Sequence, residues 1–320
     1  MLMSYSISVI IPNYNGQSLL QKNLPRVFKS VSSYENKLIE IIACDDCSAD
    51  NSLGILNRLK TKMQSLYPDI NLKIIKNKKN LGFSSNVNQG AKNAKGEILV
   101  LLNTDVCPEN NFLTPLLECF KDSSIFAVGC MDKSMENGKT ILRGRGAGSW
   151  KKGFLVHSRG DIDQTDTLWV SGGSGAFRKS IWDKLSGLDS LYDPFYWEDI
   201  DLSYRALKSG YKILFEPKSV VVHEHEKGII KGKYSLSKIK TITYRNQFIF
   251  VWKNATDISL QLAHLFWLPY HFFKALFRGD YLFFAGFFSA LLRLPWIISS
   301  SFCAQKYFTK SDKAVISNFT

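Results

Sequence analysis

Three short polar segments follow one another along this chain of 320 residues, and their side chains are suited to binding a cation and accepting a proton. They are Asp45-Asp46, Asn103-Thr104-Asp105 and Glu198-Asp199, and His223 follows the last of them. The first two come directly after apolar, β-branched runs. A carboxylate at the carboxyl end of a buried parallel strand points into the crevice where open α/β sheets bind ligands. Because unpaired buried charges are costly, carboxylates that converge there predict a divalent cation that holds a diphosphate.

Alternating apolar and amphipathic segments predict the elements that position these residues. Buried strands are expected over 6–11, 38–43, 72–75 and 97–102, and helices over 17–33, about 50–66 and, after a turn at 80–83, up to 94. Strands that alternate with helices at this spacing predict an α/β fold with a doubly wound, mostly parallel sheet. Beyond it, 128–169 predicts shorter antiparallel strands, 180–185 and 199–209 predict helices, and 212–215 and 220–222 predict two more strands.

The composition changes after about residue 240, where 258–277 and 281–302 are crowded with Phe, Leu and Trp. Charged residues and prolines interrupt both segments, so their uncharged runs are shorter than the roughly 18 to 20 residues that a spanning helix needs. Aromatic residues mixed with Lys and Arg are typical of helices that lie in the membrane interface. The alternative is a helical pair that packs on the catalytic domain or on a second copy of the chain.

The net charge and the cysteines of the chain indicate which partners and which compartment are expected. The formal net charge of +13 and the pI near 9.3 indicate an anionic partner, and nucleic acid, a sugar nucleotide or an anionic membrane would each satisfy that. The six cysteines show no paired zinc spacing, which favours a reduced cytosolic chain. The first residues lack the pattern of a secretory signal and instead predict a strand. We therefore expect the catalytic portion in the cytosol.

Six segments, taken in order, resemble the family 2 glycosyltransferases, and within them the rhamnosyltransferase-like bacterial branch that builds surface polysaccharides. These segments are 8–16, 45–50, 80–83, 103–105, 172–177 and 197–202, with a weaker match at Tyr244-Arg245-Asn246. The resemblance covers roughly 7–223. It implies a GT-A fold, a nucleotide-sugar donor, a divalent cation (Mn²⁺ or Mg²⁺) and inversion at the anomeric carbon.

The resemblance also implies roles for donor-side residues. Tyr14 would stack on the nucleotide base, a contact that contributes about 1–3 kcal/mol. Asp46 would accept a hydrogen bond from a pyrimidine N–H, which favours a UDP- or dTDP-sugar, whereas Asp45 could instead support the loop. Asn103 would reach the ribose or the diphosphate. The full set of expected donor-binding residues is Pro12, Tyr14, Asn15, Asp45, Asp46, Asn80, Asn103 and Thr104.

The metal and acceptor sides follow from the same resemblance. Asp105 and His223 would bind the cation, with His225 as the rival of His223 if the register differs. Asp199 would act as the base that takes the proton of the acceptor hydroxyl. Trp197 and Glu198 are expected on the acceptor side, although Glu198 is also suited to capping the helix.

The expected organisation has two parts, a GT-A catalytic domain over 1–228 and a region over 229–320 with a basic flap and amphipathic, aromatic helices. Lys227, Lys231 and Lys233 belong to that flap, and the segment 143–146 is a second basic element suited to an acceptor diphosphate. We expect a lipid-linked or glycan acceptor, a peripheral or monotopic position on the cytoplasmic face of the membrane, a homodimer as one possible assembly, and no nucleic-acid partner.

Three other functions fit the sequence less well. A processive polysaccharide synthase would carry a Gln-x-x-Arg-Trp motif and several spanning helices, and neither is found. A nucleotidyltransferase would need a lysine-rich phosphate loop where Pro12-Asn13-Tyr14-Asn15 stands. A catalytically inactive scaffold that binds nucleotide and membrane has no reason to keep Asp46, Asp105, Asp199 and His223 together.

Overall fold

The computed structural model describes residues 5–34, 39–136, 139–223 and 233–319. Most of its strands form one nine-stranded sheet in the order β3-β2-β1-β4-β10-β6-β11-β5, with β7 paired to β6. The strands of this sheet are β1 (Ile7–Asn13), β2 (Ile39–Asp45), β3 (Ile70–Lys76), β4 (Ile98–Leu102), β5 (Val106–Pro108), β6 (Ile125–Glu136), β7 (Lys139–Arg143), β10 (Ser174–Arg178) and β11 (Lys212–His223). A separate hairpin consists of β8 (Gly146–Lys151) and β9 (Phe154–Arg159).

The sheet is mixed: the prediction of a mostly parallel sheet holds for the first four strands and for the pair of β6 and β11, and it fails at β10, β5 and β7. The strands β3, β2, β1 and β4 are parallel, as expected. Next to them β10 runs antiparallel to both β4 and β6, and β5 runs antiparallel to β11. The two short strands expected at 212–215 and 220–222 are one strand, β11, whose register shifts between Glu216 and Val220. Pro217 lies in that shift and cannot donate to a ladder, which explains the interruption in the sequence pattern.

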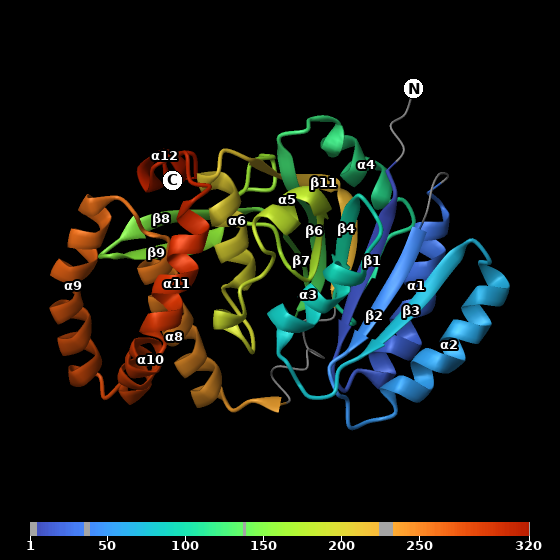
Figure 1. The fold of residues 1–320 in the computed structure, drawn as a ribbon, viewed down its shortest axis with the longest axis horizontal. Helices are drawn as coiled ribbons and strands as arrows, with labels where there is room; N and C mark the ends of the chain where they lie inside the picture. The colour runs from blue at the N-terminus through green and yellow to red at the C-terminus, as the bar shows by residue number, and fades with distance from the viewer. Residues whose placement is uncertain (1–4, 35–38, 137–138, 224–232, 320) are drawn as a thin grey trace.

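Helices cover both faces of the sheet (Figure 1). Val9 and Ile11 pack on one face with residues of α1, α2 and α4, whereas Ile10 packs on the other with residues of α3, α5 and α6. This alternation follows from the period of two in a strand, and both faces must be apolar because both are covered. The bounds are α1 (Gln17–Ser32), α2 (Ser52–Leu66), α3 (Phe83–Asn93), α4 (Leu113–Glu118), α5 (Lys179–Lys184) and α6 (Glu198–Lys208), with 3₁₀ turns η1 (Cys119–Lys121) and η2 (Ser190–Tyr192).

The C-terminal helices are joined to the sheet by one continuous core. Phe248 and Ile297 are buried in the same cluster as Ile10. Buried ion pairs add to it, since Lys208 contacts Asp312 at 2.8 Å. The helices are α8 (Leu236–Asn254), α9 (Ile258–Phe277), α10 (Tyr281–Leu291), α11 (Leu294–Gln305) and α12 (Asp312–Ile316). The expected boundary at 228/229 and the flap residues Lys227 and Lys231 lie outside the described residues, as does His225.

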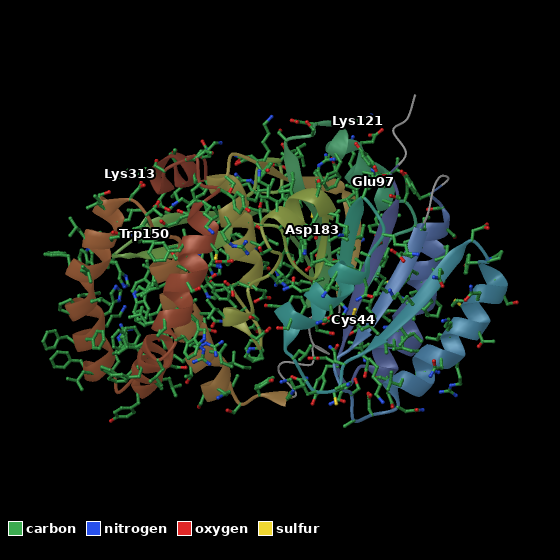
Figure 2. The ribbon with its side chains drawn as sticks, in the orientation of Figure 1. Cys44, Glu97, Lys121, Trp150, Asp183 and Lys313 are labelled. Carbon is green, nitrogen blue, oxygen red and sulfur yellow. The ribbon has the colours of Figure 1, made fainter. Side chains whose placement is uncertain are left out.

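Much of the apolar surface of α9, α10 and α11 is exposed. The exposed side chains include Ile258, Leu262, Leu265, Phe266, Phe273, Leu276, Phe277, Tyr281, Phe288, Leu292, Trp296 and Phe302. No single helix in the described ranges has the length and hydropathy to cross a membrane, whereas α10 and α11 together would pass that criterion and meet at a bend of 64°. Figure 2 shows Trp150 of β8 among these helices, in the half of the molecule opposite α1 and α2.

Candidate functional site

The carboxyl ends of the parallel strands open into a cavity of about 490 Å³. Its walls come from the ends of β1, β2 and β4, the turn before α3, the loop before β10, the start of α6 and the end of β11. The predicted residues that line it are Pro12, Tyr14, Asp46, Asn80, Asn103, Thr104, Asp105, Glu198, Asp199 and His223. Residues separated by more than two hundred positions in the sequence therefore share one cleft.

Asp46 is held by donors from the turn before α3. Its Oδ1 accepts from Asn77 Nδ2 at 2.9 Å and from the Leu81 backbone N–H at 2.8 Å, and its Oδ2 accepts from the Gly82 N–H at 3.0 Å. The side chain of Asn80 donates back to the Asp46 carbonyl at 3.3 Å. A carboxylate offers about four lone-pair sites, so Asp46 can still accept a hydrogen bond from a ligand.

Asp45 and Asn15 hold two loops together and are not among the described residues that line the cavity. Asp45 Oδ1 accepts from Asn13 Nδ2 at 2.8 Å and from Ser48 Oγ at 2.6 Å. Asn15 Oδ1 accepts from the Ala49 N–H at 2.7 Å. The structure thus places both predicted residues outside the described lining of the cavity, where they link the loop after β1 to the loop after β2; Asp45 is buried and Asn15 is exposed.

The glycine pair before β10 lets two functional side chains approach each other. A Cβ at Gly173 would lie 2.6 Å from Asn103 Nδ2, and a Cβ at Gly172 would lie 3.3 Å from the Phe83 ring and 3.7 Å from Asp199 Cβ. Larger residues at 172 and 173 would therefore push these walls apart. Asn103 Oδ1 is buried and has no hydrogen-bond partner among the described residues, so it remains available to a ligand.

His223 lies between two carboxylates at the end of β11. Its Nε2 is 3.3 Å from Asp105 Oδ1, and its Nδ1 is 3.1 Å from Asp132 Oδ2. Burial lowers the pKa of His223, but the hydrogen bonds with Asp105 and Asp132 outweigh it and raise the pKa to about 9. Asp132 is fixed in turn by Ser134 Oγ at 2.7 Å. A carboxylate that accepts from Nδ1–H is the usual support of a metal-ligating imidazole, because it fixes the tautomer and the orientation of the ring. His223 would bind a cation through Nε2 after losing the proton that Nε2 shares with Asp105.

The donor set fits a cation that is shared with a ligand. No group of three or more His, Cys, Asp or Glu side chains within the described residues could hold a metal ion alone. Asp105 and His223 both line the cavity and could each supply a ligand atom, and Asn103, whose Oδ1 has no hydrogen-bond partner in the described ranges, lines it as well. Mg²⁺ and Mn²⁺ accept such sites when phosphate oxygens and water complete the coordination.

Asp199 and Glu198 begin α6 at the opposite wall. Asp199 Oδ1 accepts from the Ile200 N–H at 2.8 Å, and its Oδ2 faces the Gly172 N–H at 3.4 Å. Burial raises the pKa of Asp199. Burial, and then the neighbouring charge of Asp199, raise the pKa of Glu198 well above its ordinary value. Because two neighbouring buried carboxylates repel each other, Glu198 and Asp199 do not readily ionise together, which suits a site of proton transfer.

The backbone before α6 is strained. Tyr196 and Trp197 have positive φ angles of 72° and 76°, which bulky residues rarely adopt. Trp197 is 5% exposed and contacts Phe250, and it is not among the described lining residues, although the sequence analysis expected it on the acceptor side. Tyr196, which is 40% exposed, lines the cavity instead. The chain thus turns the tryptophan inward and the tyrosine toward the cleft.

Basic side chains complete the cavity. Lys233 Nζ lies 3.7 Å from the centroid of the Tyr14 ring, a cation–π contact. Arg143, at the end of β7, also lines the cavity. Arg145 does not, because it is buried and bonds Asp166 at 3.0 Å. Of the basic segment 143–146, only Arg143 therefore lies where it could contact an anionic ligand.

The sequence matches the family model for glycosyl transferase family 2 over residues 8–185, more than half of its length. The chain belongs to this family. The O-antigen chain rhamnosyltransferase RfbN of Salmonella typhimurium is 26% identical over 223 residues, which cover 68% of this chain and 66% of that protein. The poly-beta-1,6-N-acetyl-D-glucosamine synthase of Staphylococcus aureus is 24% identical over 66% of this chain and 48% of its own length.

A third relative is the dolichol-phosphate mannosyltransferase of Pyrococcus furiosus, 31% identical over 38% of this chain and 32% of that protein. This family 2 chain thus spans between 32% and 66% of the length of these relatives.

Solved structures show the same fold. TarS residues 1–349 of S. aureus in complex with UDP-GlcNAc has a TM-score of 0.59 at 15% identity, covering 98% of this chain and 91% of that one. The mannosyltransferase PcManGT of Pyrobaculum calidifontis, with GDP-Man and Mn²⁺, has a TM-score of 0.57 at 17% identity, covering 95% of this chain and 75% of that chain. GalNAc-T7 with UDP, GalNAc and Mn²⁺ has a TM-score of 0.64 at 22% identity, covering 81% of this chain and 49% of that chain. This family 2 chain therefore has an α/β GT-A-like fold.

Several residues of this family 2 site were missed from sequence. Asp132, which supports His223, interrupts the apolar run that starts at Ile125, and a charge inside a buried strand was the available signal. Phe83 and Asn86 line the cavity from the first turn of α3, next to a turn that was predicted. Tyr234 also lines the cavity, just after the described residues resume at 233, and the sequence gave no signal for it.

Proposed function

We propose that this protein is an inverting, metal-dependent glycosyltransferase that takes a sugar from a nucleoside-diphosphate donor. One observation carries the proposal: Asp105, His223 and Asp199 line the same cavity as Tyr14 and Asp46. A single in-line displacement at the anomeric carbon uses three kinds of group. They are a pair of cation ligands, a carboxylate that accepts the proton of the acceptor hydroxyl, and an aromatic ring that stacks on the nucleobase of the donor.

Each wall has its own part in this reaction. Tyr14 stacks on the base, and Asp46 accepts a hydrogen bond from it. Asn103 contacts the ribose or the diphosphate, and Asp105 and His223 hold the cation. When bound, the cation offsets the charge that develops on the departing diphosphate. Asp199 takes the proton of the acceptor hydroxyl while the hydroxyl oxygen attacks from the opposite face of the sugar, which inverts the anomeric centre.

The donor that we favour is a UDP- or dTDP-sugar. Asp46 keeps a free lone pair for the N–H of a pyrimidine, and its other hydrogen bonds fix the direction of that lone pair. TarS binds UDP-GlcNAc and GalNAc-T7 binds UDP, whereas PcManGT binds GDP-Man. Proteins with this fold therefore bind nucleotides with different bases. In this chain the hydrogen bond to Asp46 would determine which nucleobase is preferred.

The acceptor that we propose is a lipid-linked glycan at the cytoplasmic face of the membrane, within cell-surface polysaccharide synthesis. Support comes from the exposed apolar residues of α9, α10 and α11, such as Phe266 and Phe277, since patches of this kind mark interaction surfaces. Lys274 and Arg278 lie at the end of α9, where they would meet anionic headgroups. In this scheme 1–228 is the catalytic domain, and 229–320 supplies the basic flap and the membrane-facing helices.

A thermal-shift screen tests the donor proposal. UDP, dTDP, GDP and ADP are each added with and without Mn²⁺. The expected result is the largest rise in melting temperature with UDP or dTDP, and a larger rise with Mn²⁺ than without it. Equal shifts from ADP would contradict the role of Asp46. A panel of nucleotide sugars that gives binding but neither transfer nor hydrolysis would contradict the enzymatic proposal and favour a scaffold.

A further inference from the structure

The segment that enters α6 combines backbone strain with a buried oxygen that no described residue satisfies. Tyr196 and Trp197 both have positive φ angles, and Glu198 Oε2 is buried without a hydrogen-bond partner among the described residues. Glu198 is 6% exposed and lines the cavity. Strain of this kind persists only where the surrounding structure holds it, and it concentrates at functional sites. An unsatisfied buried oxygen likewise indicates a ligand that completes its bonds.

Helix α8 holds this segment in place. Asn246, which is fully buried, donates through Nδ2 to the carbonyls of Tyr192, Phe195 and Tyr196 at 3.1, 2.9 and 2.8 Å. The neighbouring Arg245 donates to the carbonyls of Tyr192 and Asp193 at 3.1 and 2.7 Å. These bonds hold the backbone before the first positive φ angle and between the two, so the backbone from which the Tyr196 ring projects is fixed.

The Tyr196 ring is presented to the cavity. It is 40% exposed, lines the cavity with Glu198 and Asp199, and is braced by Phe195 at a centroid distance of 4.8 Å and an interplanar angle of 73°. Phe195 in turn meets Tyr234 at 4.9 Å. A rigid, partly exposed aromatic ring beside carboxyl groups matches a pyranose, which offers an apolar C–H face together with hydroxyl groups.

We infer that Tyr196 and Glu198 form the acceptor-sugar subsite, in which the Tyr196 ring packs on the face of a pyranose and Glu198 hydrogen-bonds one of its hydroxyls. The inference rests on the proposed function, because the sugar must place a second hydroxyl within reach of Asp199. It assigns the aromatic contact to Tyr196 in place of the buried Trp197. Asn246 is a positioning residue, which acts through the Tyr196 backbone.

Saturation-transfer NMR with simple glycosides tests the subsite directly. The probes are methyl β-D-glucopyranoside, methyl α-L-rhamnopyranoside and methyl N-acetyl-β-D-glucosaminide, in the presence of UDP and Mn²⁺ so that the donor side is filled. We expect saturation of the ring protons of at least one probe in the wild-type protein. Tyr196→Ala should lower that signal by about fivefold or more, and Tyr196→Phe should keep it because the ring is retained.

A matched control separates the ring from a general effect of losing a tyrosine. Tyr307 is 38% exposed and does not line this cavity, so Tyr307→Ala should leave the signal unchanged. The melting temperature of each variant shows that it is folded. No saturation of any probe in the wild-type protein, or full saturation in Tyr196→Ala, would overturn the inference.

The inference and the proposed function fail in different ways. If a nucleotide sugar is turned over but Tyr196→Ala binds the glycosides like the wild-type protein, only the subsite is wrong. If no nucleotide sugar is turned over by the wild-type protein, the proposed function is wrong whatever the glycosides show.

Discussion

The two walls of the cavity are held in place by different means. On the wall formed by the ends of β1 and β2, Asp45 and Asp46 have their oxygens bonded by neighbouring loops. On the wall that begins α6, Glu198 Oε2 has no hydrogen-bond partner within the described part of the chain, and Tyr196 has a positive φ angle. On the first wall the carboxylates of Asp45 and Asp46 are fixed by hydrogen bonds within the protein, although Asn13 Oδ1 has no partner among the described residues and Asn15 and Cys47 have positive φ angles of 50° and 62°. On the second wall the backbone is held by α8, and its carboxyl group Glu198 is not fixed in the same way. The two walls therefore differ most in how their carboxyl groups are held.

The largest expected effect concerns Asp199. Asp199→Asn keeps the shape of the side chain but removes the base, so transfer should fall by about a hundredfold to ten-thousandfold. Donor affinity should stay within about twofold, because Asp199 lies on the opposite wall. Steady-state transfer and UDP binding by calorimetry measure the two quantities. Unchanged turnover would remove Asp199 from the mechanism.

The pH dependence of transfer follows from the same residue. A base must be deprotonated to act, and the pKa of Asp199 is raised by burial. The rate should therefore fall with decreasing pH through a pKa above the ordinary value of an aspartate, about 3.9. A rate that stays constant down to pH values near that ordinary value would contradict the raised pKa.

The protein should become less stable when the carboxylate of Asp46 is removed from the wall formed by the ends of β1 and β2. Asp46→Ala leaves the Leu81 and Gly82 N–H groups and Asn77 Nδ2 without their acceptor, which should lower the free energy of unfolding by about 2–3 kcal/mol. Urea denaturation measures the change. Asp163, an exposed carboxylate, supplies the control, since Asp163→Ala should change stability by less than about 0.5 kcal/mol. Equal effects of the two variants would refute the view of Asp46 as a structural centre of this wall.

The protein should become more stable when the buried carboxyl group of Glu198 is replaced by a neutral group. In the folded state the pKa of Glu198 is raised, so stability due to this group falls as pH rises from about 4.3, the unfolded value, through the folded pKa. Glu198→Gln lacks this loss. It should match the wild-type protein near pH 4 and be the more stable of the two at pH values above the unfolded pKa of Glu198, with a difference that grows as pH rises toward the folded pKa. A variant that is less stable at neutral pH would mean that Glu198 is already satisfied.

The same comparison separates what the sequence could predict from what it could not. The strands β1 to β4 and the polar residues at their ends were predictable, because buried parallel strands give short apolar runs that end in turn chemistry. The inward rotation of Trp197 was not, since it depends on positive φ angles that Asn246 maintains from fifty positions away. The spacing of residues around Trp197 does not reveal hydrogen bonds from a residue as distant in sequence as Asn246.

Helix α8 gave no helical prediction for a related reason. It is buried on several sides, so its apolar residues do not form one stripe, and the run Phe248–Val251 resembles a buried strand. The antiparallel entry of β10 was equally hidden, because a short glycine-rich strand has no periodicity that reveals the direction of its neighbours. The expectation that Asp105 and His223 share one cleft came instead from the resemblance to the family 2 glycosyltransferases, and both residues line the cavity.

Calorimetric titration of UDP into the wild-type protein and Asp105→Ala, each with Mn²⁺ and with EDTA, tests the central claim most directly. The account predicts one site per chain, an affinity that depends on Mn²⁺, and a loss of about tenfold or more in Asp105→Ala. In EDTA the two proteins should bind UDP alike. Equal affinity of the two proteins in Mn²⁺, with no effect of EDTA, would contradict a cation held between Asp105, His223 and the diphosphate.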